Sequence, residues 1–307
     1  MDWIDGPVRV RVPATSANLG PGFDTLGLAL ARYDEVEARV ADGGLDVEVA
    51  GEGSADVRRD ESHLVVRAMH ATFDAMGARP AGLRLTCVNR IPHSRGLGSS
   101  AAAITAGVAA ARALAGLPED RDAVFRTAAT IEGHPDNVAP CAYGGATIAW
   151  SQDGEWRATR LTPSPELRPV ICVPDWWVST ERARALLPDT VPYGDAALNA
   201  GRAALLVVAL TRSPALLMDA TVDRLHQEYR RPAMPAALEL TEALRDVGVP
   251  AVISGAGPSV LALGQAGNPA TTADSIGRIT GTGWHIHPLD ADLDGLQVQA
   301  PVQLPGS

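Results

Sequence analysis

Alternation of apolar and polar residues dominates the first part of the chain. This period-two pattern predicts strands at residues 8–12, 35–40, 46–49 and 83–88. Between the last two runs, apolar residues recur at helical spacing over residues 62–76, which predicts a helix ending at Gly77. The pattern therefore predicts an N-terminal unit that contains both strands and helices.

Two further helices are predicted to follow. Residues 99–114 are rich in alanine, the residue with the highest helix propensity, and Gly116 comes soon after them. A second helix is predicted over residues 120–132, and Gly133 stops it. Both helices belong to the same N-terminal unit as the strands.

A change of composition marks the expected boundary between two domains. A strand is predicted at residues 146–150, and residues 151–169 after it are polar and contain three prolines. We therefore expect two domains, residues 1–158 and residues 159–307.

Strands and helices are mixed in the second half as well. Strands are predicted at residues 170–173, 251–254, up to 263, and 284–287, with helices at 180–187, 195–211, 215–222, 235–247 and 272–280. After Leu289 the chain is acidic and then rich in Gln and Pro, which predicts an edge strand followed by disorder. Two blocks of mixed elements indicate an α+β architecture of two layered domains.

The basic residues exclude a large group of phosphate-handling mechanisms. All 26 of them, among 307 residues, are arginine, so the chain contains no lysine. A phosphate-binding Walker lysine, a protein-kinase lysine and a Schiff-base lysine are therefore excluded. If the protein handles phosphate, it must use backbone N–H groups, arginine, hydroxyls or a metal.

Charge and hydropathy narrow the choice of partners. The net charge of −10 argues against a nucleic-acid-binding protein, which needs a basic face. No apolar run approaches the roughly 20 residues of a membrane span, and no signal sequence is recognisable, so we expect a cytoplasmic protein with no membrane partner. Three cysteines without paired spacing indicate neither a disulfide framework nor a zinc site.

A loop rich in glycine and serine, residues 92–102, lies between a predicted strand and a predicted helix. Gly96 and Gly98 allow positive φ angles and a close approach of backbone to ligand. Ser99 and Ser100 suit a helix start, where free N–H groups and the helix dipole attract anions. The loop could cradle phosphate without lysine, although a simple turn capping an ordinary helix has the same composition.

Two other glycine-rich segments favour the phosphate interpretation. Residues 12–24 contain the run P-A-T-S-A-N-L-G-P-G-F-D after a strand, and residues 254–259 form a second glycine turn between strands. In order and approximate spacing, the three segments resemble the signature motifs of the GHMP kinase superfamily. The first resembles the branch of that superfamily that phosphorylates homoserine, and the similarity extends through about residue 288.

This resemblance implies a fold and an activity. The implied fold has an N-terminal ribosomal-protein-S5-like α/β domain and a C-terminal ferredoxin-like α+β domain. The implied reaction is transfer of the γ-phosphoryl group of ATP to the side-chain hydroxyl of L-homoserine, with Mg²⁺, in threonine biosynthesis. Two alternatives stay open: a GHMP kinase for mevalonate or a sugar, and a catalytically silent ligand sensor. A homodimer is a further expectation.

The resemblance also implies which residues hold the nucleotide and the metal. Mg²⁺ is expected on Ser100 and Glu132, since Mg²⁺ takes most of its ligands from phosphate and water. A helix cap and a solvated surface acid are the alternative interpretations of these two residues. The residues expected to hold the nucleotide are Pro92, His93, Ser94, Arg95, Gly96, Leu97, Gly98, Ser99, Ser100, Ala101, Ala102, Gly255 and Gly257.

The amino-acid substrate needs partners for its carboxylate, ammonium and hydroxyl groups. Arginine suits a carboxylate, and motif register selects Arg184 and Arg230 over their neighbours Arg182 and Arg231. The resemblance places Asn18 and Asp24 near the amino and hydroxyl end and turns His134 and Asn137 toward the same pocket; Thr180 is expected near the substrate or as a helix N-cap. Asp24 and Asn137 are the catalytic candidates, with Asp24 orienting the hydroxyl rather than acting as a strong base.

Overall fold

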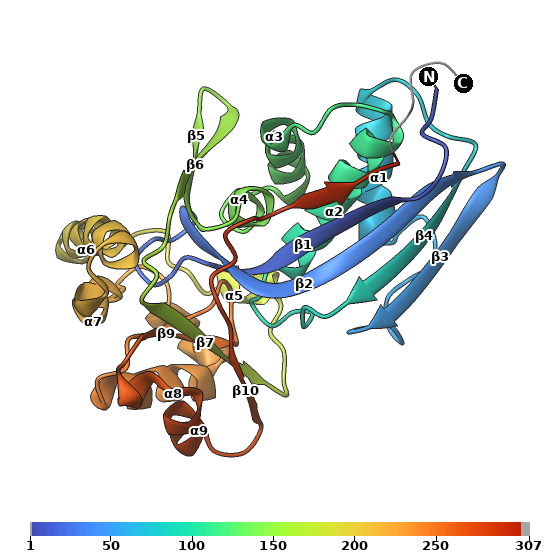
Figure 1. The fold of residues 1–307 in the computed structure, drawn as a ribbon. Helices are drawn as coiled ribbons and strands as arrows, with labels where there is room; N and C mark the ends of the chain where they lie inside the picture. The colour runs from blue at the N-terminus through green and yellow to red at the C-terminus, as the bar shows by residue number, and fades with distance from the viewer. Residues whose placement is uncertain (1, 302–307) are drawn as a thin grey trace.

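The computed structural model describes residues 2–301 and contains two β-sheets (Figure 1). The larger sheet has the order β11-β1-β2-β4-β3, and β5 extends it by pairing with β2 and β6. All its pairings are antiparallel except β3 with β4. Its strands are β1 (Val8–Ala17), β2 (Leu26–Ala41), β3 (Gly44–Gly51), β4 (Gly82–Asn89), β5 (Ala146–Gln152), β6 (Glu155–Leu161) and β11 (Gln297–Gln299).

One face of the larger sheet is covered by four helices: α1 (Leu64–Ala75), α2 (Ser99–Leu114), α3 (Arg121–Glu132) and α4 (Val138–Tyr143). The central helix, α2, is buried along almost its whole length because its alanines allow neighbouring elements to approach closely. A Cβ at Gly107 would lie 2.6 Å from the carbonyl oxygen of Val65 in α1. This packing fixes the start of α2, where the glycine-rich loop ends.

The smaller sheet is antiparallel, with the order β10-β7-β9-β8. Its strands are β7 (Leu167–Pro174), β8 (Ala251–Ile253), β9 (Val260–Gln265) and β10 (Trp284–Pro288). The helices of this half are α5 (Thr180–Arg184), α6 (Tyr193–Thr211), α7 (Leu217–Ala220), α8 (Pro235–Asp246) and α9 (Ala273–Thr280), with 3₁₀ turns at Pro214–Leu216, Glu228–Ala233 and Pro269–Thr271.

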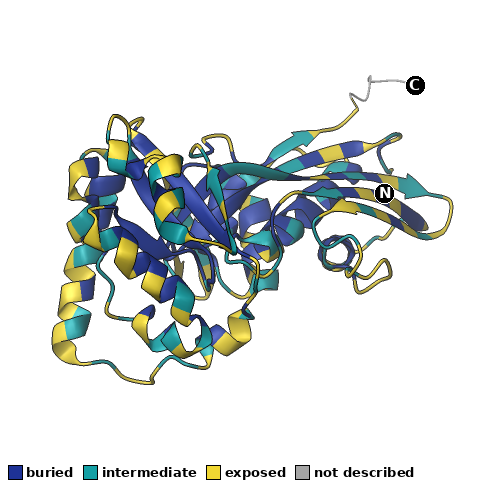
Figure 2. Cartoon of the chain, turned by 90° about the horizontal axis from the view of Figure 1, so that it is seen from below, coloured by how far each residue is buried: buried dark blue, intermediate teal, exposed yellow. Residues whose placement is uncertain are grey.

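Alternate residues of β7 connect the two halves of the molecule. Ile171 and Val173 belong to the larger hydrophobic core, which is formed mainly by residues of the N-terminal half. Val170 and Cys172, on the other face of the strand, belong to a smaller core beneath α8 and α9. Buried residues accordingly run from the strands into the inward sides of the surrounding helices (Figure 2). The larger core is continuous across both sheets, so it holds the segments between them in a fixed arrangement.

The elements differ from the sequence-based expectations in several places. The predicted linker over residues 151–169 contains β6, which pairs with β5 along its whole length and consists of exposed and half-buried residues. The pattern also missed α4, and the helix predicted over 180–187 ends at Arg184. The expected edge strand is present as β11, which pairs with β1. Residues 302–307, in the part of the tail for which disorder was predicted, lie outside the described residues.

The proposed boundary between residues 158 and 159 stays a prediction, and it falls inside β6. The cysteines, Cys87, Cys141 and Cys172, are free and buried. Over residues 2–301, no helix combines the length and the apolar character needed to cross a membrane.

Candidate active site

The three glycine-rich segments meet at one place between the sheets. The hydroxyl of Ser254 donates to the carbonyl oxygen of Gly96, 2.6 Å away, and lies 2.8 Å from the hydroxyl of Ser16, from which it accepts. The N–H of Gly255 donates to the carbonyl oxygen of Ala17 at 3.1 Å. Segments separated by up to 238 residues are thus hydrogen-bonded to one another.

The start of α2 offers backbone N–H groups to an anion. Its N-cap is Gly98, which has φ +70° and no side chain to cap the helix. The first intrahelical bond is donated by Ala102 to the carbonyl oxygen of Gly98, so the N–H groups of Ser99, Ser100 and Ala101 have no partner within the helix. Together with the helix dipole, these donors fit a phosphate group.

A glycine is required at position 96. Its φ is +73°, and a Cβ there would lie 2.1 Å from the carbonyl oxygen of Ser254. Gly77 has the same φ of +73°, but a Cβ there would have nothing within 4 Å, which makes it a matched control.

We expect Gly96→Ala to lower the free energy of unfolding by about 2 to 5 kcal/mol. The alanine would be strained in a left-handed backbone conformation, and its Cβ would also displace the loop that contains Ser254. Gly77→Ala should cost only about 1 to 2 kcal/mol. Urea denaturation of both variants measures the difference. Equal losses would show that the two glycine loops do not depend on this close approach.

Ser100 and Glu132 form a pair of oxygen donors beside this helix start. The hydroxyl of Ser100 donates to Oε2 of Glu132 at 2.7 Å, and burial raises the pKa of Glu132 although the bond to Ser100 opposes the rise. Nowhere in residues 2–301 do three or more His, Cys, Asp or Glu side chains group to hold a metal. Two hard oxygen donors fit a Mg²⁺ ion that takes its other ligands from phosphate and water.

A cavity of about 140 Å³ lies in front of the loop and gathers most of the predicted site residues. A second cavity of about 690 Å³ adjoins it, because Ser94 lines both; Pro92, His93 and Arg95 line the larger one. The smaller cavity is lined by Asn18, Ser94, Gly96, Leu97, Gly98, Ser99, Ser100, Glu132, His134, Asp136, Asn137, Thr180, Arg184, Arg230, Gly255 and Ala256.

Asp24 and Arg184 bind each other in this structure. Both oxygens of Asp24 accept from the Arg184 guanidinium, at 2.6 and 3.0 Å, and the bond raises the pKa of Arg184. Asp24 has a positive φ of +52°, and its N–H donates to Oδ1 of Asn18 at 2.9 Å. The amide of Asn18 donates in turn to the carbonyl oxygen of Gly255. The motifs assigned Asp24 and Arg184 to separate groups of the substrate and did not predict this pair.

Arg230 is buried, with 1% of its surface exposed, and lines the same cavity. Burial, and next the charge of Arg184, lower the pKa of Arg230 to about 10. Arg231 instead pairs with Glu228 and Glu242 at the surface, and Arg182 is exposed. Of the two neighbouring pairs of arginines, the structure brings Arg184 and Arg230 to the cavity.

The segment after α3 adds a fixed set of polar groups. Nδ1 of His134 lies 3.0 Å from Oδ1 of the buried Asp136, and this contact raises the pKa of His134 despite burial. Asn137 accepts from the hydroxyl of Thr15 at 2.8 Å. Thr180 lines the cavity but is not the helix N-cap, since Ser179 holds that position.

Three predicted nucleotide residues lie differently from what the loop pattern suggested. The guanidinium of Arg95 donates to the carbonyl oxygens of His93, Pro174 and Asp175, so it joins the two domains instead of facing the loop. The N–H of Ala102 donates to the carbonyl oxygen of Gly98, so it is not free for a ligand. Gly257 lines neither cavity, and its N–H donates to the carbonyl oxygen of Ser254.

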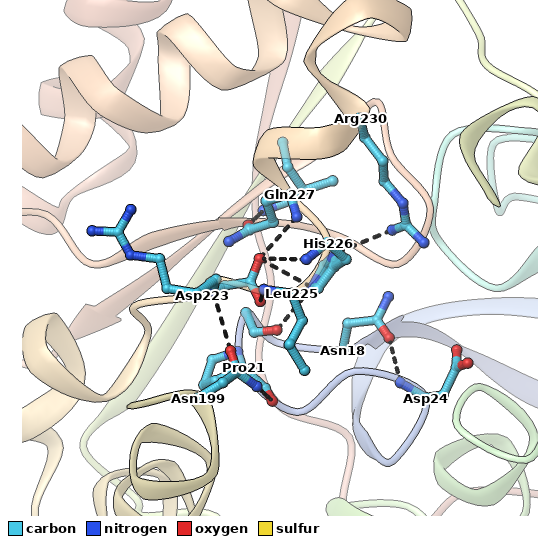
Figure 3. A network of polar contacts seen from close by, with 12 residues as sticks. Asn18, Pro21, Asp24, Asn199, Asp223, Leu225, His226, Gln227 and Arg230 are labelled. Atoms are coloured by element: carbon cyan, nitrogen blue, oxygen red, sulfur yellow. Dashed lines mark hydrogen bonds and ion pairs between the residues drawn. The ribbon is translucent and has the colours of Figure 1, made fainter. Parts of the chain in front are cut away.

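The sequence reasoning missed a buried polar network behind the cavity (Figure 3). The carboxylate of Asp223 accepts from the N–H groups of Leu225, His226 and Gln227. Nε2 of His226 bonds to the carbonyl oxygen of Gly20 in the first glycine segment. The available signal was an Asp followed closely by residues whose N–H groups it can accept from, an Asx-turn pattern that is common in loops and therefore weak.

Comparisons with known proteins agree with this arrangement. The family model of the GHMP kinases N-terminal domain matches residues 63–145, and that of the GHMP kinases C-terminal domain matches residues 196–284. A homoserine kinase of Streptomyces coelicolor is 58% identical over 95% of this chain and 94% of its own length. A homoserine kinase of Clavibacter michiganensis is 50% identical over 95% of this chain and 94% of its own length.

Solved structures share the fold. The crystal structure of homoserine kinase from Cytophaga hutchinsonii has a TM-score of 0.83 and 28% identity, covering 95% of this chain and 97% of that one. The mevalonate kinase of L. major, with 16% identity and a TM-score of 0.68, covers 94% of this chain and 96% of that one. At that level of identity the second likeness concerns the fold alone.

Proposed function

The chain belongs to the homoserine kinase family of the GHMP kinases, and we propose that it transfers the γ-phosphoryl group of ATP to the side-chain hydroxyl of L-homoserine. It is an ATP-dependent small-molecule kinase with the N- and C-terminal domains of that superfamily. The observation that carries the substrate assignment is the convergence of Arg184 and Arg230 on the cavity beside the phosphate-binding helix start. The roles of individual residues proposed below extend this function.

The nucleotide phosphates would be held by the N–H groups at the start of α2. Ser100 and Glu132 are the proposed protein ligands of Mg²⁺, and their 2.7 Å contact supports this assignment. Bound Mg²⁺ would supply positive charge to neutralise the phosphate oxygens. The cavity of about 690 Å³ next to the loop has the size for the nucleoside.

The substrate carboxylate would take the place of Asp24 on Arg184. Arg184 donates to Asp24 through two nitrogens, and one oxygen of the substrate carboxylate could accept from this guanidinium while the paired edge of the carboxylate faces Arg230. Such an exchange would free Asp24 for the ammonium and hydroxyl end of the substrate, where Asn18 already holds its backbone. His134, Asn137 and Thr180 complete the proposed pocket.

Asp24→Asn separates positioning from base catalysis at this site. Phosphoryl transfer through a loose transition state depends mainly on positioning and charge neutralisation. A general base contributes about 10²- to 10⁴-fold, so we expect Asp24→Asn to lower kcat by less than about 100-fold and to leave measurable activity. Complete loss of turnover with ATP binding intact would contradict the positioning role.

Asp46→Asn is a matched control for this variant. It breaks an exposed ion pair, 3.0 Å long, between Asp46 of β3 and Arg84 of the adjacent strand β4. Neither residue lines the cavity. Because surface pairs contribute little, kcat should stay at the wild-type value. Steady-state kinetics of both variants, at saturating ATP and L-homoserine, make the comparison.

A substrate panel tests the proposed function. ADP release should follow addition of L-homoserine with ATP and Mg²⁺, and should be absent with mevalonate or galactose. Turnover of mevalonate or galactose instead of L-homoserine would assign a different GHMP kinase. Ligand binding without ADP release from any of the three would assign the silent sensor. The homodimer and the cytoplasmic location stay predictions, the first to be decided by light scattering.

A further inference from the structure

The guanidinium of Arg230 makes hydrogen bonds on one side only. Its Nη1 donates to Nδ1 of His226 at 3.1 Å (Figure 3). The same nitrogen donates to the carbonyl oxygen of Gly255, also at 3.1 Å, which uses both of its hydrogens. Its Nε is buried and has no hydrogen-bond partner within residues 2–301. Nη2 makes no hydrogen bond to that part of the chain either.

The uncommitted edge has the geometry for a carboxylate. Nε–H and Nη2–H lie side by side on the guanidinium and match the two oxygens of a carboxylate. A buried donor without a partner is costly, so a ligand that accepts from it binds with that cost removed. Arg230 lines the cavity of about 140 Å³, and the proposed substrate brings one carboxylate into it.

The surroundings of His226 determine which of its nitrogens carries the hydrogen. Nε2 faces the carbonyl oxygen of Gly20 at 2.8 Å, and a carbonyl can only accept, so Nε2 must be protonated. Nδ1 faces the Arg230 guanidinium, which can only donate, so Nδ1 must offer a lone pair. The ring is therefore neutral, and burial also lowers the pKa of His226.

The ring of His226 is also held in position from other directions. It is fully buried and stacks on Phe23 with ring centroids 5.0 Å apart. Its backbone N–H donates to the carboxylate of Asp223 at 3.1 Å. A ring fixed in this way offers Arg230 an acceptor at one defined place.

We propose that His226 is a positioning residue for substrate binding, which by accepting from Nη1 of Arg230 leaves the Nε/Nη2 edge of that guanidinium for the carboxylate of L-homoserine. This inference rests on the proposed function. Without the acceptor, the guanidinium can turn about its terminal torsion and present a different edge. His226 touches no substrate atom and acts only through Arg230.

Two amide substitutions separate positioning from a purely structural role. In His226→Asn the side-chain oxygen reaches the region of Nδ1, so it can still accept from Arg230, but the bond to Gly20 is lost. In His226→Gln the longer amide can still donate to Gly20, but the acceptor for Arg230 is lost. A purely structural role gives no reason for these variants to differ in KM for L-homoserine alone.

We expect His226→Gln to raise KM for L-homoserine roughly 10- to 100-fold, the scale of a hydrogen bond to a charged group, with KM for ATP and kcat near wild type. His226→Asn should stay within about threefold of the wild-type KM. In an Arg230→Met background, His226→Gln should change KM no further, because the two residues act as one unit. An unchanged KM in His226→Gln, or equal rises in both variants, overturns the proposal.

A second measurement needs no variant. Long-range ¹H–¹⁵N spectra of the wild-type protein should show His226 as the Nε2–H tautomer, with its Nδ1 signal shifting on addition of L-homoserine but not of ATP alone. An Nδ1–H tautomer overturns the proposal even if the variants fail to fold. Absence of wild-type turnover with L-homoserine would contradict both the proposed function and this inference. Wild-type turnover with an unchanged KM in His226→Gln would contradict only the inference.

Discussion

Glu132→Ala is expected to lower kcat about 100- to 1000-fold, which is the scale for losing one preorganised group that acts on the charge of a transition state. The carboxylate of Glu132 is largely buried beside the helix start and 2.7 Å from the hydroxyl of Ser100. No other carboxylate in the described chain approaches that hydroxyl within hydrogen-bond distance. The proposed Mg²⁺ site would therefore keep a single, neutral protein ligand.

The measurement is kcat at saturating ATP and L-homoserine over a range of Mg²⁺ concentrations. The variant should also need a higher Mg²⁺ concentration for half-maximal activity. Glu132 lies 3.9 Å from Nε2 of His134. Glu61→Ala is a matched control because Glu61 likewise pairs with a histidine, His70 at 3.0 Å, but on the surface. Wild-type kcat and Mg²⁺ dependence in Glu132→Ala would contradict the metal assignment.

Arg184→Met and Arg230→Met are each expected to raise KM for L-homoserine about 30-fold or more. Removing one partner of a buried, hydrogen-bonded charge pair costs about 2 to 5 kcal/mol, which corresponds to roughly 30- to 5000-fold. Arg230 should have the larger effect because it is almost fully buried, whereas the Arg184 side chain is 37% exposed. KM for ATP should stay near wild type in both variants.

The neighbouring arginines give matched controls for this prediction. Arg182→Met and Arg231→Met remove the same charge from exposed or surface-paired positions and should leave KM unchanged. A substrate analogue without the carboxylate, 3-aminopropan-1-ol, should bind wild type and both site variants about equally. A carboxylate-independent rise in KM would show that these arginines support the fold of the site instead of binding the substrate.

The backbone of the loop rich in glycine and serine could be predicted well because it depends on local chemistry. Positive φ angles at Gly96 and Gly98, and a helix start at Ser99, follow from residue types that are adjacent in the chain. The fold class followed from the alternation of strands and helices for the same reason. The structure adds the tertiary contact that requires the glycine at position 96, the close approach of the carbonyl oxygen of Ser254.

The contacts inside the site could not be predicted in this way. The ion pair of Asp24 with Arg184 joins residues 160 positions apart, and no local pattern specifies it. The bond between His226 and Gly20 spans 206 positions. Strand β6 was missed for a different reason, since an exposed hairpin strand has few apolar residues to reveal its period.

The absence of lysine now has a structural counterpart. Arginine would be the obvious substitute beside a phosphate loop, yet Arg95 turns its guanidinium to the carbonyl oxygens of Pro174 and Asp175. In our proposal the N–H groups at the start of α2 therefore hold the phosphates. The acidic chain thus keeps Arg184 and Arg230 for the cavity that we assign to the amino acid.

The central claim is that this cavity directs the side-chain hydroxyl, and not the carboxylate, of L-homoserine to the phosphoryl group. ³¹P NMR of a reaction with ATP, Mg²⁺ and L-homoserine tests it most directly. We expect ADP and one new phosphate monoester whose phosphorus couples to the side-chain CH₂ protons and which is stable to hydroxylamine. An acyl phosphate that hydroxylamine cleaves, or ATP left unchanged in the presence of L-homoserine, would contradict it.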